Sequence, residues 1–383
     1  MERIGTIIVV MAWLTTGGLL VAADLSMEDA GRVQALFEEA RTLAENGQND
    51  QALEKFDAAI AIDEKHAPSY VGKGHILLES GDLDGAEATF KLALKKRKNH
   101  PQVFNGLGLV YRERKNELRR AIDYFRSALR KEKTYVEAQF NLAETYERFG
   151  SSETLKNYKM VVKMDPGHPE AFFRLGRIHA GDRDYEKAMA AFRDQIRVKP
   201  DHYEARLHLA MALKGTGGLQ EAIEELEQVV NRTSDFQRRA VLELADIYQR
   251  KLEFDRSQAL YEAYISGLDE SEQVNYYDLS VVASGEVGER FKSAPLETMK
   301  ALADTFWSVL DPAPVTVANE RLVEHYRRVS TAREHMGTHK DPWDDRGDVY
   351  VRYGEPDHVS RSNNIRFETD PRALQVKERL ISL

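Results

Sequence analysis

The sequence of 383 residues contains no cysteine. This absence excludes disulfide bonds, thiolate metal sites, a cysteine nucleophile and a lipid anchor on an N-terminal cysteine. An excess of basic residues is also missing: the formal net charge is −9, which argues against a dedicated nucleic-acid-binding protein. The chain lacks the nucleophile elbow of a Ser-His-Asp hydrolase and any carboxylate pair assignable to acid–base catalysis. Its 42% of hydrophobic residues is ordinary for a globular protein of two or three domains.

One long apolar run lies at the N-terminus. Arg3 precedes an apolar stretch over residues 4–22, and small residues lead up to Ala23. This layout is typical of a secretory signal cleaved after Ala23. A run of about 20 residues is also long enough to remain as an uncleaved membrane anchor. We therefore predict that residues 1–23 direct the protein to a periplasmic or secreted location, or anchor it to the inner membrane.

Three sets of residues recur through two-thirds of the chain. A small residue recurs at Ala40, Gly74, Gly108, Ala143, Gly176, Ala210 and Ala245. A large apolar residue recurs at Phe56, Phe90, Phe125, Tyr158, Phe192, Leu226 and Tyr261. Four residues before each of these lie Ala52, Ala86, Ala121, Thr154, Ala188, Ala222 and Ser257. The last two sets advance in steps of 34, 35, 33, 34, 34 and 35 residues, which indicates seven repeats in phase.

The spacing within a repeat predicts a pair of helices. The small residue lies in the first helix, where a missing side chain allows the second helix to cross closely. The other two positions are i and i+4 on the second helix, so both project into the crossing. Residues 32–266, most closely in "PQVFNGLGLVYRERKNELRRAIDYFRSALRKEKT", resemble the tetratricopeptide repeat (TPR). The resemblance implies a right-handed superhelix whose first helices line a concave groove.

The resemblance also places polar residues beside the small position in that groove. We predict that the partner-binding residues are Asn105, Arg112, Asn141, Glu144, Arg174, Arg177 and His208. The alternative is that these residues only solvate an exposed helix face. Only Asn141 and Arg174 match the set that holds a terminal carboxylate in some members of the family, so such a clamp is not expected.

A basic stretch covers residues 91–133, which hold 14 Lys and Arg against 4 Asp and Glu. It could bind an anionic lipid or polymer. The alternative is an outward helix face balanced by acidic residues elsewhere. We expect no nucleic acid as a partner, because the chain as a whole is acidic.

The repeat period is lost after Ser266. We predict a helical connector over residues 267–294, a helix from Pro295 to Leu310, a second helix over residues 317–336 and a strand over residues 348–353. The stretch "PWDDRGDVYVRYGEPD" and the two helices before it resemble the bacterial GWxTD domain over residues 296–359. Four residues match its motif: Trp343, Asp345, Arg346 and Gly347. The motif departs at Pro342, where Gly is expected. The resemblance implies further strands, and we expect the domain to stop short of a full sheet.

The segment around Trp343 has three interpretations. The structural one makes Asp345 and Arg346 an ion pair or loop cap and places Trp343 in the corner between helix and strand. A recognition surface around Trp343 is the second. A cation site built from His335, His339 and the neighbouring aspartates is the third. Elsewhere, histidines fall at one phase of the repeat, so we interpret them as turn residues and not as metal ligands: His66, His100, His168 and His202.

Together these patterns predict a mostly α protein. We expect a signal or anchor (1–23), a TPR solenoid of about seven repeats (24–266), a connector (267–294) and a small α+β domain (295–383). The predicted function is a non-enzymatic protein–protein interaction scaffold of the bacterial cell envelope, with a protein or peptide partner, no cofactor and no metal. The alternatives are a cation-dependent hydrolase or metal-binding module in the C-terminal domain, and anionic lipid or polymer binding at residues 91–133.

Overall fold

The computed structural model describes residues 25–97, 100–114, 116–232, 236–292, 294–312, 317–338 and 341–355. The predicted signal or anchor segment lies outside these residues. Within them, every regular element is a helix and no strand occurs. The chain forms two compact units, residues 1–175 and 176–383, and each is described by itself.

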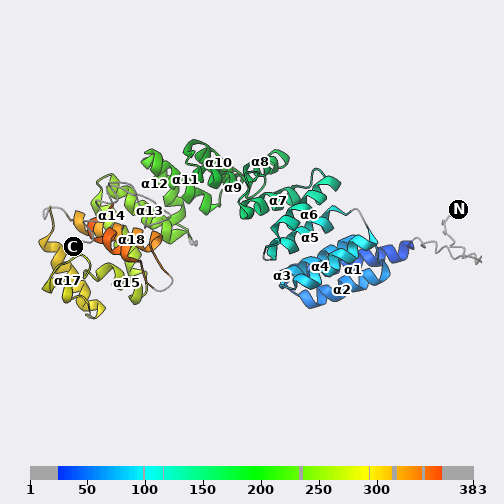
Figure 1. The fold of residues 1–383 in the computed structure, drawn as a ribbon, viewed down its shortest axis with the longest axis horizontal. Coiled ribbons are helices and arrows are strands. Elements are labelled where there is room, and N and C mark those ends of the chain that lie inside the picture. The colour runs from blue at the N-terminus through cyan, green and yellow to red at the C-terminus, as the bar shows by residue number, and fades with distance from the viewer. Residues whose placement is uncertain are drawn as a thin grey trace, which may run out of the picture. The chain divides into compact units, whose positions relative to one another are not determined.

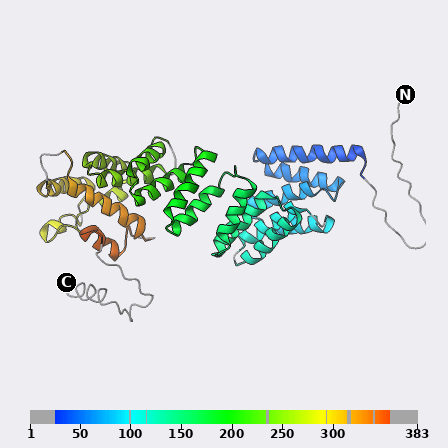
Figure 2. The same cartoon turned by 90° about the horizontal axis from the view of Figure 1, so that it is seen from above.

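The first unit consists of consecutive helices that pack in sequence order (Figures 1 and 2). The helices are α1 (Met27–Glu45), α2 (Asn49–Ile62), α3 (Ala67–Glu79), α4 (Leu83–Lys96), α5 (Pro101–Glu113), α6 (Leu118–Lys131), α7 (Val136–Phe149) and α8 (Thr154–Met164). Helix α9 (Ala171–Gly181) runs across the boundary between the two units.

The second unit continues the helix pairs and then adds the C-terminal helices. The helices are α10 (Tyr185–Val198), α11 (Tyr203–Thr216), α12 (Leu219–Val230), α13 (Gln237–Arg250), α14 (Phe254–Ser266), α15 (Glu270–Tyr277), α16 (Glu286–Glu289), α17 (Leu296–Val309), α18 (Glu320–His335) and α19 (Asp345–Tyr353). Helix α14 of the last repeat packs against both α15 and α18 (Figure 1).

The recurring small and aromatic residues form the core of the repeats, as predicted. Phe90, Phe125 and Phe192 are completely buried. A Cβ atom added to Gly74 would lie 2.4 Å from the ring of Phe90, and one added to Gly108 would lie 2.5 Å from that of Phe125. The missing side chain is therefore what lets the two helices of a repeat approach each other.

A left-handed residue recurs at the turn between the helices of each repeat. The residues with positive φ at this position are Gly47, Gly81, Asn116, Gly150, Arg183, Gly217 and Leu252. This conformation suits glycine, and asparagine tolerates it, but it strains a residue with a bulky side chain. Leu252 and Arg183 are therefore the strained members of the series.

The seventh repeat packs as the others do, although it has a serine in its second helix. The hydroxyl of Ser257, at the position usually held by alanine, is buried and donates a hydrogen bond to the carbonyl oxygen of Ala245 at 2.8 Å. Tyr261 of this repeat lies 6.1 Å from Tyr326 of α18, measured between ring centroids. The repeat thus closes the solenoid by packing against the C-terminal helices.

The predicted strand over residues 348–353 is wrong, and with it the α+β class of the C-terminal domain. These residues form the greater part of helix α19. A strand would place Val349, Val351 and Tyr353 on one face. Instead, Val349 and Tyr353 are 44% and 62% exposed, whereas Tyr350 and Val351 are buried. With Gly347, the buried residues follow the i, i+3, i+4 period of a helix. The side chain of Asp344 caps this helix by accepting a hydrogen bond from the backbone N–H of Arg346.

Candidate functional site

Five of the seven predicted groove residues lie in the first unit, where they form one polar network. The Arg112 guanidinium donates to Asn141 at 3.1 Å and to Glu144 at 2.9 Å. Arg174 approaches Glu144 from the next repeat at 3.1 Å. Asn105 is completely buried and accepts a hydrogen bond from the Asn141 amide at 3.0 Å.

The same contact recurs in the second unit between residues that the sequence analysis missed. Lys214 stands four residues after its small residue, as Arg112 does, and it pairs with Glu243 and, at 2.9 Å, with Asp246. Burial alone would lower the pKa of Lys214, but these two carboxylates raise it. The repeat phase predicts this contact. A cation four residues after the small residue of one repeat faces two acceptors in the next repeat. These acceptors lie two residues before and one residue after the small residue of that repeat.

The other two predicted groove residues, Arg177 and His208, lie in the second unit, and the charge of Arg177 affects the pKa of His208. Burial, followed by the positive charges of Arg177 and Arg239, lowers the pKa of His208 to about 4. The His208 ring also stacks on Phe192 with 5.7 Å between centroids. His208 is therefore neutral at pH 7, whereas Arg177 presents a positive charge on the exposed face of α9.

Carboxylates from outside the basic stretch 91–133 pair with some of its cations. Arg114 contacts Asp84 and Glu87 at 2.6 Å each. Lys96 pairs with Glu64, and the Arg120 guanidinium lies 4.0 Å above the ring of Tyr111. These contacts favour the alternative in which acidic residues elsewhere balance the stretch.

The histidines at the repeat phase lie at helix N-termini. His202 Nδ1 accepts a hydrogen bond from the backbone N–H of Ala205 at 3.1 Å, and His168 Nδ1 accepts one from Glu170 at 3.2 Å. His66 and His100 occupy the N-cap positions of α3 and α5. All four histidines thus lie where one repeat ends and the next begins.

The segment around Trp343 is a packing unit within the described residues. The Trp343 indole N–H donates to Asp348 at 2.8 Å, and an added Cβ on Gly347 would lie 2.4 Å from the indole. The ion pair involves Asp344 and Arg346, at 2.6 Å, and not Asp345 as predicted. His339 lies outside the described residues, and inside them no group of three metal-binding side chains occurs.

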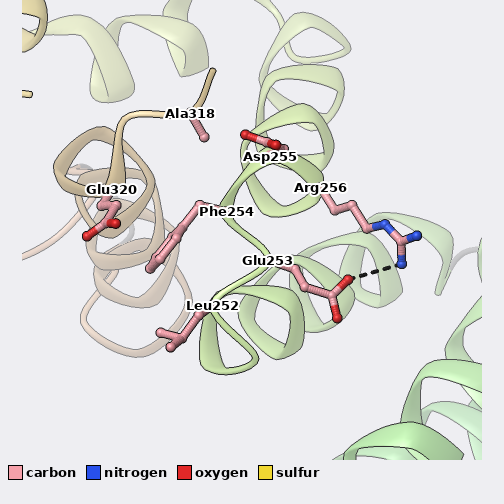
Figure 3. A pocket seen from close by; sticks show the side chains of 7 residues that line it. All are labelled: Leu252, Glu253, Phe254, Asp255, Arg256, Ala318 and Glu320. Carbon is pink, nitrogen blue, oxygen red and sulfur yellow. Dashed lines mark ion pairs between the residues drawn. The ribbon is translucent and has the colours of Figure 1, made fainter. Parts of the chain in front are cut away.

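Three hollows lie along the seam where the seventh repeat meets the C-terminal helices. Their volumes are about 330, 660 and 490 Å³, and Phe254 lines all three. Figure 3 shows the smallest, in which the side chain of Phe254, the first residue of α14, extends towards the helix that carries Glu320. The sequence gives no sign of this seam, because its walls come from segments without a common period.

A carboxylate at this seam ties the last repeat to the C-terminal helices. The side chain of Glu324 on α18 accepts hydrogen bonds from Gln249 at 2.7 Å and from Arg327 and Arg328 at 2.8 and 2.7 Å. Burial alone would raise the pKa of Glu324, but the hydrogen bonds from the two arginines and the charge of Arg327 lower it to about 2.

Comparison with known families agrees with both parts of this architecture. Models of the tetratricopeptide repeat match residues 43–108, 155–197 and 179–240, and a model of the GWxTD domain matches residues 281–368. The chain carries tetratricopeptide repeats and a GWxTD domain. The GWxTD match begins inside the predicted connector and continues beyond Glu355, the last described residue.

Several proteins of known name or structure are similar to part of this chain. The TPR repeat-containing protein MJ1428 of Methanocaldococcus jannaschii is 25% identical over 56% of this chain and 38% of its own length. Anaphase-promoting complex subunit CDC16 of Saccharomyces cerevisiae is 28% identical over 46% of this chain and 22% of its own length. The solved structure of Pseudomonas aeruginosa pilF covers 58% of this chain and 99% of that chain, with 14% identity and a TM-score of 0.49. This chain thus spans less than half the length of both curated relatives.

No helix among the described residues is long and apolar enough to cross a bilayer.

Proposed function

We propose that this TPR–GWxTD protein is a non-enzymatic scaffold of the bacterial cell envelope that binds a segment of a partner protein on the first-helix face of its repeats. The TPR architecture itself supports a protein–protein interaction scaffold. The observation that carries the proposal further is the set of polar residues that recurs beside the small residue on the first helices of each unit. In the first unit they form the network around Glu144, and in the second they include Arg177 and His208.

The mostly buried residues of this set hold neighbouring repeats together. We therefore assign partner binding to the residues of the set that are exposed. Arg112 and Glu144 are 16% and 23% exposed and pair with each other. Arg177 follows its small residue directly, as Glu144 does; it is exposed, and its charge affects His208. A carboxylate of a partner segment approaching this face would meet Arg177 first.

The test is a pull-down with the full chain from envelope extract of the native host, with charge-reversal variants. Arg177→Glu should lose a specific partner that the unchanged chain retains. Arg197→Glu, on the second helix of the same repeat with its side chain 74% exposed, should retain it. Equal retention by both variants, or no specific partner at all, would reject the first-helix face as the binding site.

The envelope location rests on the sequence of residues 1–23, which lie outside the described residues. Expression of the full chain in a bacterial host followed by N-terminal sequencing tests it. A chain that begins at Asp24 in the periplasmic fraction supports cleavage. An intact N-terminus in the membrane fraction supports an anchor, and an intact N-terminus in the soluble cytosolic fraction refutes the envelope location.

A further inference from the structure

The largest of the three seam hollows, called here the seam cavity, has walls from both parts of the second unit. Gln249 and Phe254 belong to the seventh repeat, Trp307 to α17, and Glu324, His325 and Arg328 to α18. Its volume of about 660 Å³ is far above the roughly 30 Å³ share of a single water molecule. It lies in the range of about 300–1,000 Å³ in which proteins hold organic ligands.

Three buried polar atoms of residues that line the seam cavity have no hydrogen-bond partner among the described residues. They are the indole Nε1 of Trp307, the Nδ1 of His325 and the Oε1 of Gln249. Trp307 and His325 are only 7% and 3% exposed, and their rings lie 5.2 Å apart between centroids. Buried polar atoms are normally paired, so three unpaired ones in the side chains of one cavity wall favour a polar occupant over an apolar one.

The hydrogen-bonding role of each atom follows from its neighbours. The Nε2 atom of His325 lies 3.0 Å from the carbonyl oxygen of Tyr276, which can only accept, so Nε2 carries the proton and Nδ1 is an acceptor. The Gln249 amide nitrogen donates to Glu324, which leaves its Oε1 as an acceptor. The Trp307 indole can only donate. The occupant therefore has to provide one acceptor and two donors.

The residues of the cavity wall and rim restrict further which kind of molecule the cavity can bind. Phe254, Phe306 and Leu310 supply apolar surface. At the rim, Arg321 and Arg352 have no ion-pair partner among the described residues, while Arg328 is already neutralised by Glu324. Glu320 opposes them with one negative charge, so the rim still carries an excess of positive charge.

We propose that the seam cavity binds a short acidic, apolar peptide segment of a partner protein. Peptide groups offer N–H donors and carbonyl acceptors along one chain, which matches the unpaired atoms. Apolar side chains of the segment would contact Phe254 and Phe306, and its carboxylate would face Arg321. The inference extends the proposed scaffold function by giving the GWxTD domain a second peptide site, next to the last repeat.

The test is an NMR titration of the full chain that follows the indole N–H resonance of Trp307, assigned with a Trp307→Phe variant. The probe is acetyl-Asp-Leu-Phe-Leu-amide, and its analogue with lysine in place of aspartate is the control. We expect a saturable shift of this resonance with a dissociation constant below about 1 mM, and binding at least about tenfold weaker for the lysine analogue. Maltotriose is a second probe, because a saccharide also carries donors and acceptors.

Two matched variants locate the binding. Arg321→Glu at the rim should weaken binding of the acidic probe by about tenfold, whereas Arg290→Glu, exposed on the same unit and absent from the cavity wall, should not change it. Arg177→Glu should also leave the titration unchanged, so failure of the repeat-face proposal and failure of this one are distinguishable.

Three results would overturn the proposal. The first is no saturable shift with either peptide. The second is a stronger response to maltotriose than to the acidic peptide, which would assign the cavity to a saccharide. The third is a Trp307 indole proton that is protected from hydrogen exchange before any probe is added and stays unaffected by it. That result would mean that the probe does not reach this side of the cavity.

Discussion

The Arg112 guanidinium lies 2.9 Å from a carboxylate oxygen of Glu144, one repeat further along the chain. Both side chains are mostly shielded from water, and Glu144 also receives Arg174 from the following repeat. Three successive repeats are thus connected through one carboxylate. Because each repeat otherwise contacts mainly its neighbours, such links contribute directly to the interfaces that hold the solenoid together.

Replacing Arg112 by methionine should lower the free energy of unfolding by about 1–3 kcal/mol, because Glu144 and Asn141 lose a donor in a partly buried site. A double-mutant cycle with Glu144→Gln, measured by urea unfolding, should give a coupling energy of about 0.5–3 kcal/mol. The exposed Lys131→Met variant is the control and should change stability by no more than about 0.5 kcal/mol. A coupling energy of zero would show that the pair adds nothing to the repeat interface.

Replacing Leu252 by glycine should stabilise the protein. Leu252 has a φ of 62° and is 73% exposed, so its side chain loses little on removal while its backbone is strained. Relief of the backbone strain should contribute about 1–2 kcal/mol to the free energy of unfolding. Glycine also has more conformational freedom in the unfolded chain, which reduces the net gain to about 0.5–1 kcal/mol. The Leu252→Ala variant keeps the strain and should show no gain in thermal unfolding; equal gains for both variants would disprove the explanation.

Replacing Gly347 by alanine should destabilise the GWxTD domain although alanine favours helices. The new methyl group would lie 2.4 Å from the Trp343 indole, which would have to move and give up its hydrogen bond to Asp348. We expect a loss of about 1–3 kcal/mol, together with a change in tryptophan fluorescence. Gly31→Ala in α1 is the control, because nothing lies within 4 Å of its new methyl group, and it should stabilise by up to about 1 kcal/mol.

The buried His325 should make the protein less stable in mild acid. Burial lowers the pKa of His325 to about 4 in the folded protein, against about 6.5 in the unfolded chain. The unfolded chain therefore takes up a proton that the folded protein refuses. Stability is complete above about pH 6.5 and is lost as the pH falls towards 4, by on the order of 3 kcal/mol.

A His325→Gln variant isolates this contribution. It should be less stable than the unchanged protein at pH 7, and the difference between the two should shrink by on the order of 3 kcal/mol by pH 4. Urea unfolding at a series of pH values measures both. His208, whose pKa is lowered to about 4 as well, is present in both proteins and cancels in the comparison. A difference that does not change with pH would contradict the assignment.

Much of the repeat architecture could be predicted because its contacts are local and periodic. Gly74 and Phe90 belong to adjacent helices of one repeat, and their spacing alone indicates that they meet. The cross-repeat contacts of Arg112 and Lys214 obey the same period, but only the structure shows which polar side chains pair with each other.

The sequence by itself determined the seven helix pairs, their buried rows and the resemblance to the two families, since a repeated spacing specifies the same packing each time. Only the tertiary structure decided that residues 348–353 are helical, because Tyr350 and Val351 bury themselves against the last repeat and α18 rather than in a sheet. It alone also brought Gln249, Trp307 and His325 around one cavity. Those residues lie on three separate helices with no shared period, so their meeting depends on how the C-terminal helices pack on the seventh repeat.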